Sequence, residues 1–432
     1  MLLRLSRHRL RSRILLFLAL SFLSWILLPY DNGLVLLVRW HFGHVSHALA
    51  ASDAWMRKPP AFPLGTADVG LIVKTGFSTQ ERLVARLETL GKARDRSNVV
   101  LVGDYATGQR THFKHNGAEM PVYNALAYMV DSGSLASRPN ALRLQHYRNL
   151  TNAISGGETD LARYISSLEI GYKVMPDKKW YVLSDDDSYP LDASLEVILG
   201  NLNPLRPYYI GNAIGNYQAR FAHGGSAVVF SQAALYRIFV RNTGVVSRAH
   251  LESLDSNRGD KLIATTAMKS GIYLEERYSR YFNGEPPRLT RIRPDRFCAP
   301  VTSFHNLSPS QMHDVGKVFK SAAKAISWVD IWKIYTAPNF ENFLETPTRS
   351  DWDHVGVLDD GTMNTTSTPD VATKEACLNI CLRHDSTCLA WTWEAGSKAC
   401  YTKPWLIVGS SSKGKFSGIN AKRAMALSRK CR

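Results

Sequence analysis

Three consecutive carboxylates follow a run of aromatic and apolar residues near the middle of the chain. Asp185, Asp186 and Asp187 come shortly after residues 180–183, whose Trp, Tyr, Val and Leu side chains are typical of a short buried strand. Adjacent carboxylates repel one another unless a cation lies among them, and hard divalent cations prefer oxygen ligands. We therefore expect a metal site at the end of this strand. The alternative is an acidic turn on the surface.

Paired glycines precede a second apolar run. Gly224 and Gly225 stand just before residues 227–230, which form another predicted strand. Glycine lacks a Cβ, so the backbone at this point is able to approach a ligand closely. The alternative is a plain turn.

Two further residues have side chains suited to the same chemistry. Asp260 opens a helix predicted over residues 261–270, so its carboxylate is either a general base or a helix N-cap. His305 follows the apolar stretch 301–304 and is placed to complete a metal site, although an isolated histidine is more often structural.

Alternating strands and helices are needed to position these residues. Residues 69–73 and 98–102 are predicted strands, and residues 80–90 between them have leucines at helical spacing. A strand, a helix and a strand at this spacing form a βαβ unit with parallel strands. We therefore expect an α/β domain over residues 67–345, with further elements that include a helix at 161–168 and a strand at 208–210.

The amino terminus has the pattern of a membrane anchor. Five arginines lie within residues 1–13, and residues 14–38 contain two apolar runs separated by a short break. Positive charge before an apolar segment predicts a cytoplasmic tail, a signal-anchor over residues 14–38 and a lumenal remainder. The alternative is a cleaved signal peptide. Residues 39–66 end in a proline-rich stretch and are predicted to form a stem.

Composition and charge narrow the range of partners. Hydrophobic residues make up 45% of the 432 residues and charged residues 21%, which is typical of a chain that folds. The formal net charge of +16 falls to +11 without the five amino-terminal arginines. The remaining basic residues form no block, so we expect no nucleic-acid partner and mild attraction of anionic ligands such as nucleotide diphosphates.

Cysteines and glycosylation sequons indicate the secretory pathway. The six cysteines include no Cys-x-x-Cys pair, so an even number in this context favours disulfides over a metal site. Three sequons, at Asn149, Asn306 and Asn364, fit the same compartment. We therefore expect a single-pass type II protein of the Golgi or ER membrane.

In this order, the aspartate run, the Gly-Gly strand, Asp260 and His305 resemble the fringe-like β1,3-glycosyltransferase superfamily, particularly its fungal-type members with a cysteine-rich tail. The resemblance covers roughly residues 69–305. It implies a GT-A-type α/β fold that uses a UDP-sugar as donor and Mn²⁺ as cofactor. The implied reaction is inverting transfer of the sugar to a hydroxyl of a glycan or glycoprotein, with a β1,3 linkage.

The resemblance also assigns roles to residues of this chain. The metal ligands fall on Asp185, Asp187 and His305, and the catalytic base falls on Asp260. Family members commonly carry two acids in tandem at the catalytic position, whereas this chain has a glycine before Asp260, so Asp255 is the second choice. The residues that the resemblance places against the donor are Thr75, Arg82, Asp104, Asp185, Asp186, Gly224 and Gly225.

The tail has a resemblance of its own. Residues 346–432 look like a linker followed by a PAN/apple module, a small disulfide-rich α+β unit that binds protein or carbohydrate. Cys377 and Cys381 are spaced so that both face one side of a helix. Among the 15 connectivities that six cysteines allow, we favour Cys381–Cys388, Cys377–Cys400 and Cys298–Cys431. The alternative role is a disulfide-stabilised cap without a ligand.

Two other classes of function compete with sugar transfer. One is a catalytically silent membrane protein that presents the PAN-like module to glycans or proteins. The other is a metal-dependent hydrolase that uses the aspartates, which would need more histidines near the acids than the sequence supplies.

Overall fold

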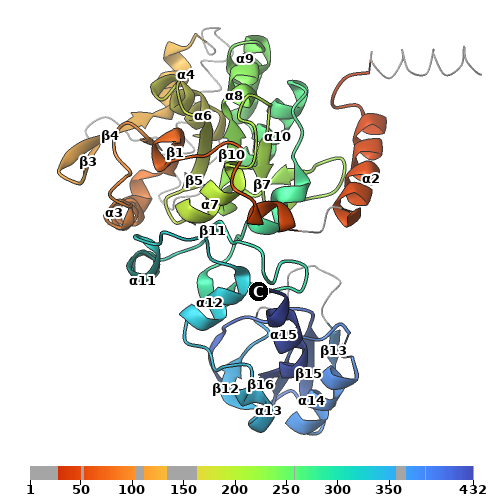
Figure 1. The fold of residues 1–432 in the computed structure, drawn as a ribbon. Helices are drawn as coiled ribbons and strands as arrows, with labels where there is room; N and C mark the ends of the chain where they lie inside the picture. Colours follow the sequence, from red (N-terminus) through yellow and green to blue (C-terminus); the bar gives the residue numbers. More distant parts are fainter. Residues whose placement is uncertain are drawn as a thin grey trace, which may run out of the picture.

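The computed structural model describes residues 28–49, 53–103, 111–133, 163–256, 258–356, 366–384 and 386–431. An α/β domain is followed by a smaller C-terminal module, residues 346–431 (Figure 1). Residues 1–27, Asp104 and the sequons at Asn149 and Asn364 lie outside the described residues. Among the residues that are described, no helix is both long and apolar enough to span a bilayer.

A seven-stranded mixed sheet forms the centre of the α/β domain. The predicted βαβ unit is confirmed, because β1 and β2 pair in parallel and helix α3 (Gln80–Thr89) connects them. Strands β4 and β5 continue the parallel part, and β3 and β10 run antiparallel to their neighbours. The strand order is β3 (His112–His115), β4 (Ala118–Asn124), β2 (Val99–Gly103), β1 (Val69–Thr75), β5 (Trp180–Asp185), β10 (Val228–Ser231) and β7 (Tyr209–Gly211).

Helices cover both faces of this sheet, which explains why its central strands are apolar on both sides. Leu71 and Val182 point into one core and pack with helices α3, α7 (Asp192–Leu199) and α11 (Pro309–Phe319). Ile72 and Tyr181, one residue away, point into the second core. That core is covered by α6 (Arg163–Val174), α8 (Gln232–Phe239), α9 (Thr243–Ser253) and α10 (Gly259–Lys269).

A small two-stranded sheet connects the aspartate run to the end of the domain. Strand β6 (Tyr189–Pro190) follows the aspartates and pairs with β11 (Ser303–Phe304) in antiparallel register. The pairing places Tyr189 opposite Phe304. His305, the next residue after β11, is thereby brought to the carboxyl end of β5.

The C-terminal module contains a five-stranded antiparallel sheet with helix α14 (Lys374–Arg383) packed on it. The favoured disulfides are confirmed, since Cys381 is bonded to Cys388 and Cys377 to Cys400. Part of the predicted linker belongs to this sheet, because β12 forms its edge. The strand order is β12 (Arg349–Asp353), β16 (Ser410–Ile419), β14 (Ala390–Glu394), β15 (Ala399–Lys403) and β13 (Thr366–Thr368).

The module and the α/β domain share a core. Leu406 and Val408 belong to the same buried cluster as Trp332 of α12 (Trp328–Ile334), and Leu406 exchanges two backbone hydrogen bonds with Ile292. The third predicted disulfide, Cys298–Cys431, joins residues 133 positions apart and crosses this interface. The module is therefore a fixed part of the molecule.

Residues ahead of the α/β domain also pack on it. Helix α2 (Gly33–Leu49) includes residues 34–38 of the predicted anchor and the start of the predicted stem. The Arg39 guanidinium lies 3.7 Å from the centre of the Tyr273 ring, and Asp53 accepts a 2.6 Å hydrogen bond from the Tyr281 hydroxyl. The sequence predicted that residues 39–66 form a spacer, but the described part of this segment contacts the α/β domain. The sequence did not indicate these contacts, because Tyr273 and Tyr281 are remote along the chain.

Candidate metal centre

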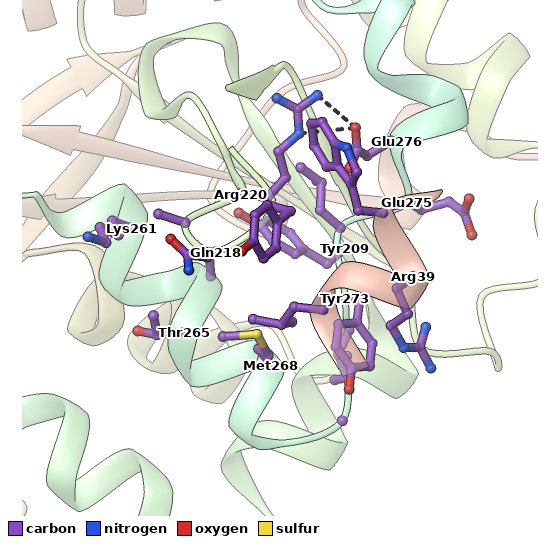
Figure 2. A pocket seen from close by; sticks show the side chains of 18 of the residues that line it. Arg39, Tyr209, Gln218, Arg220, Lys261, Thr265, Met268, Tyr273, Glu275 and Glu276 are labelled. Atoms are coloured by element: carbon purple, nitrogen blue, oxygen red, sulfur yellow. Dashed lines mark hydrogen bonds and ion pairs between the residues drawn. The ribbon is translucent and has the colours of Figure 1, made fainter. Parts of the chain in front are cut away.

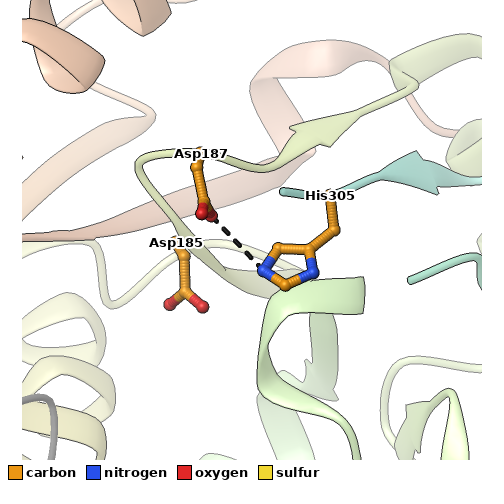
Figure 3. A group of neighbouring side chains, drawn as sticks. All are labelled: Asp185, Asp187 and His305. Carbon is orange, nitrogen blue, oxygen red and sulfur yellow. Dashed lines mark ion pairs between the residues drawn. The ribbon is translucent and has the colours of Figure 1, made fainter. Parts of the chain in front are cut away.

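The structure brings together the three side chains that the sequence predicts as metal ligands. One ligand atom from each of Asp185, Asp187 and His305 lies within 4.8 Å of the other two (Figure 3). The Nε2 atom of His305 is 3.4 Å from Oδ1 of Asp187. Asp185 ends strand β5, and Asp187 lies in the turn after it.

Backbone contacts fix the orientation of this group. The Nδ1 atom of His305 donates to the carbonyl oxygen of Gly284 over 3.3 Å, which leaves Nε2 facing Asp187. The backbone NH of Leu307 donates to the carbonyl of Asp187 over 3.1 Å and holds the two turns together. A hydrogen bond to the second ring nitrogen is how metal-binding histidines are normally aligned.

The donor set fits a divalent cation. Oδ1 of Asp185 and Oδ1 of Asp187 are both buried, and the imidazole of His305 faces the second of them. Burial raises the pKa of Asp187, and the neighbouring carboxylate of Asp185 adds to the shift. Two carboxylates and an imidazole suit Mn²⁺ and related divalent ions, and three protein ligands leave positions open for a substrate.

Lys74 is a charged neighbour of the site and precedes Thr75, in the segment that the resemblance places against the donor nucleotide. Its side chain is buried, with Nζ 2.5 Å from Oδ1 of Asp185 and 3.1 Å from the centre of the Tyr164 ring. Burial opposes ionisation of Asp185, but the Lys74 ammonium outweighs it, and the pKa of Asp185 is lowered. The signal was a lysine within the apolar run of β1, which becomes a buried strand.

Asp186, the middle carboxylate, is not part of the group formed by Asp185, Asp187 and His305. It accepts hydrogen bonds from the hydroxyls of Thr75, over 2.8 Å, and Thr79, over 2.5 Å. Burial raises its pKa to about 7, although both hydroxyls act in the opposite direction. Thr75 and Asp186, both predicted to contact the donor, therefore contact each other and tie the turn after β5 to the end of β1.

Arg82 reaches the aspartates from helix α3. Its Nη1 atom lies 3.3 Å from Oδ2 of Asp187, and its side chain remains half exposed. The Asp187 carboxylate thus has Arg82 on one oxygen and His305 on the other.

The paired glycines provide space for side chains of the chain itself. A Cβ on Gly225 would lie 2.2 Å from Nε2 of His305, and a Cβ on Gly224 would lie 2.2 Å from the Tyr164 hydroxyl oxygen. The sequence analysis expected the glycines to admit a ligand. In the structure, the space beside the two glycines is occupied by the side chains of His305 and Tyr164, both remote in sequence.

Asp260 lies in the first turn of α10 and does not cap it. The N-cap residue is Arg258, whereas Asp260 accepts a 2.8 Å hydrogen bond from its neighbour's backbone NH and a 3.4 Å bond from the NH of Gly224. Asp255, the second choice for the base, is exposed. A Cβ on Gly259 would lie 2.2 Å from the Tyr164 ring, so a tandem acid would clash there.

His223 also belongs to the site, although the sequence analysis gave it no role. Its ring centre is 5.3 Å from that of His305, and its Nδ1 lies 2.8 Å from the hydroxyl of Ser226. Burial lowers its pKa, and the nearby His305 adds to the effect. Its position directly before the paired glycines was the available signal.

Comparison with known proteins assigns one part of the chain. Residues 357–418 match the family model of the PAN domain. The match agrees with the predicted resemblance of the tail, and we therefore call the C-terminal module the PAN module. No curated protein matches the chain. The PAN match lies outside the α/β domain, so the function of that domain is argued from its site.

Proposed function

We propose that the chain is a metal-dependent glycosyltransferase. It transfers a sugar from a UDP-sugar to a hydroxyl of a glycan or glycoprotein, with inversion and a β1,3 linkage. The observation that carries the proposal is the convergence of Asp185, Asp187 and His305 at the carboxyl end of a parallel strand. Ligands of open α/β sheets bind at that edge.

The roles of the residues follow from their surroundings. A bound divalent cation would supply a Lewis acid that neutralises the leaving diphosphate. Arg82 adds a half-exposed positive charge beside Asp187, suited to phosphate oxygens. Lys74 is buried against Asp185 and holds that carboxylate in place. Asp260, held by the NH of Gly224, would accept the proton of the acceptor hydroxyl.

The proposal includes a GT-A-type fold and a lumenal location. The mixed sheet with a parallel centre and helices on both faces is compatible with that fold. Three disulfides favour an oxidising compartment such as the ER or Golgi lumen. We retain a type II anchor over residues 14–38 as part of the proposal.

A second candidate function rests on the PAN match. Under this alternative, the chain has no transferase activity, and the PAN module binds a glycan or a protein. The two candidates differ in whether the α/β domain binds metal and nucleotide.

Calorimetry with MnCl₂, followed by UDP, tests the proposal. We expect wild type to bind UDP only with the metal, and Asp187→Ala to lose both interactions. Asp177→Ala removes an exposed aspartate ahead of β5 and is the matched control. A screen of UDP-sugars should then show manganese-dependent turnover. Wild-type protein that binds neither Mn²⁺ nor UDP would contradict the proposal. Binding of a glycan or a protein by the PAN module would then be the remaining candidate function.

A further inference from the structure

A cavity of about 590 Å³ lies beside helix α10, outside the metal centre (Figure 2). Its walls come from α2, from residues 217–220, from α10 and from residues 271–276. This volume falls in the range of small-molecule sites. Asp185, Asp187 and His305 do not line it.

The lining combines aromatic faces with planar polar groups. Trp40, Tyr217 and Tyr273 contribute rings, and Gln218 and Arg220 contribute an amide and a guanidinium. Aromatic rings pack against the C–H faces of pyranose sugars. Amide and guanidinium groups form paired hydrogen bonds with neighbouring hydroxyls. This combination is suited to a saccharide.

One polar pair in the wall is already held in place. Arg220 donates from Nε and Nη2 to Oε2 of Glu276, over 3.0 and 2.7 Å. The guanidinium also lies 4.9 Å from the centre of the Trp40 ring. The pair offers a donor and an acceptor side by side, with little ordering needed on binding.

The charges of the lining nearly balance. Arg39, Arg220 and Lys261 contribute three positive charges, Glu275 and Glu276 contribute two negative charges, and Glu276 is paired with Arg220. Sugar hydroxyls are able to donate to the carboxylates and to accept from Arg220 and Lys261. This mixed set of donors and acceptors suits an uncharged saccharide.

The cavity adjoins the proposed catalytic base through helix α10. Lys261 and Ala264 line the cavity, and Asp260 directly precedes Lys261 in the first turn. Residues 260 and 264 lie one turn apart on the same side of the helix. Tyr209 also lines the cavity, and its hydroxyl accepts a 2.8 Å hydrogen bond from the NH of Ala222, two residues before Gly224.

We propose that this cavity binds the acceptor saccharide and directs one of its hydroxyls toward Asp260. The inference rests on the proposed transferase function and adds the location and chemical class of the acceptor. Helix α2 contributes the outer wall through Arg39 and Trp40, so the segment that follows the predicted anchor takes part in acceptor binding.

Binding of the full-length, detergent-solubilised protein to an array of uncharged and acidic oligosaccharides tests the inference. The metal-free protein is used, and the strongest-binding saccharide is then titrated by calorimetry. We expect Trp40→Ala and Thr265→Trp, which remove a ring and fill the cavity, to weaken binding at least about tenfold. Tyr236→Ala removes a half-exposed ring from α8 outside the cavity, and we expect it to bind as wild type.

Two outcomes would overturn the inference. One is the absence of wild-type binding to any saccharide on the array. The other is undiminished binding by both cavity variants, which would place the saccharide elsewhere, such as on the PAN module. Titration of the same proteins with MnCl₂ and UDP reports separately on the metal centre, so failure of the transferase proposal is distinguishable from failure of the cavity proposal.

Discussion

Gly225 illustrates how the absence of a side chain positions a metal ligand. The His305 imidazole occupies the space where a Cβ of residue 225 would lie, and its Nε2 atom faces Asp187 as a result. The glycine is therefore needed for close packing of a ring and has no positive backbone φ.

We predict that Gly225→Ala displaces His305 and weakens Mn²⁺ binding by at least about tenfold, the scale of a disturbed ligand shell. Calorimetry with MnCl₂ measures the effect. Gly244→Ala is the matched control, because a Cβ there would meet nothing within 4 Å. Equal Mn²⁺ affinity for Gly225→Ala and wild type would contradict this prediction.

Substitution of Asp260 distinguishes a role in proton transfer from a role in metal binding. We predict that Asp260→Asn leaves Mn²⁺ and UDP binding near wild type but lowers transfer by about two to four orders of magnitude, the usual contribution of a general base. The amide oxygen of asparagine keeps the hydrogen bond from the NH of Lys261, so the helix start should be preserved. Transfer at the wild-type rate would move the base to Asp255.

At the scale of elements, the segment from Gly284 to Arg291 links the metal centre to the PAN module. Gly284 accepts from His305, and the next residue, Glu285, is held by Arg291 through its backbone NH, over 3.0 Å, and its Nε, over 2.7 Å. The Arg291 guanidinium lies 5.1 Å from the centre of the Trp405 ring. Trp405 contacts Arg291, Arg291 holds Glu285, and Glu285 follows Gly284. Trp405 therefore supports, indirectly, the Gly284 carbonyl that orients His305.

We predict that Arg291→Ala weakens Mn²⁺ binding by about 10- to 100-fold, because the carbonyl that aligns His305 loses its support. Arg291→Lys should restore part of the affinity. Arg293→Ala is the control, since Arg293 also lies over Trp405 but pairs with Asp295. Unchanged Mn²⁺ affinity in Arg291→Ala, measured by calorimetry, would assign this segment a structural role alone.

For the whole molecule, His354 lies at the interface between the α/β domain and the PAN module. It is buried with ring centres of Trp332 and Phe343 at 5.2 and 5.6 Å, and its Nδ1 donates to the carbonyl of Ile407 over 3.1 Å. Its Nε2 has no hydrogen-bond partner among the described residues. Burial lowers the pKa of His354 to about 4, so the ring is neutral in the folded protein at neutral pH.

We predict that acidification destabilises the fold through this residue. The pKa is about 6.5 in the unfolded chain and about 4 in the folded one, so the unfolded state takes up the proton first. The contribution of His354 to the free energy of unfolding is fully present above about pH 6.5. It decreases as the pH falls toward 4, by up to about 1.4 kcal/mol per pH unit. Urea unfolding at several pH values, compared with His354→Asn, isolates this slope. Parallel pH profiles for the two proteins would contradict the prediction.

Local sequence patterns determined much of this protein. The apolar runs of 69–73 and 98–102 with a helix between them specified the parallel pair β1 and β2, because burial on both faces requires continuous apolar strands. The carboxylates after 180–183 and the late histidine indicated the group of Asp185, Asp187 and His305 that the structure assembles. The preferred cysteine pairs were also those that form.

Only the tertiary structure decided which way each of these side chains faces and what it contacts. Asp186 turns to Thr75 and Thr79, 111 and 107 residues away, and Lys74 of β1 pairs with Asp185 of the adjacent strand. The reason is physical. Local spacing sets a strand or a helix, but the contacts of a buried charge depend on which distant elements pack beside it. The contacts of α2 with Tyr273 and Arg220, and the cavity that α2 and α10 both line, are long-range features of the same kind.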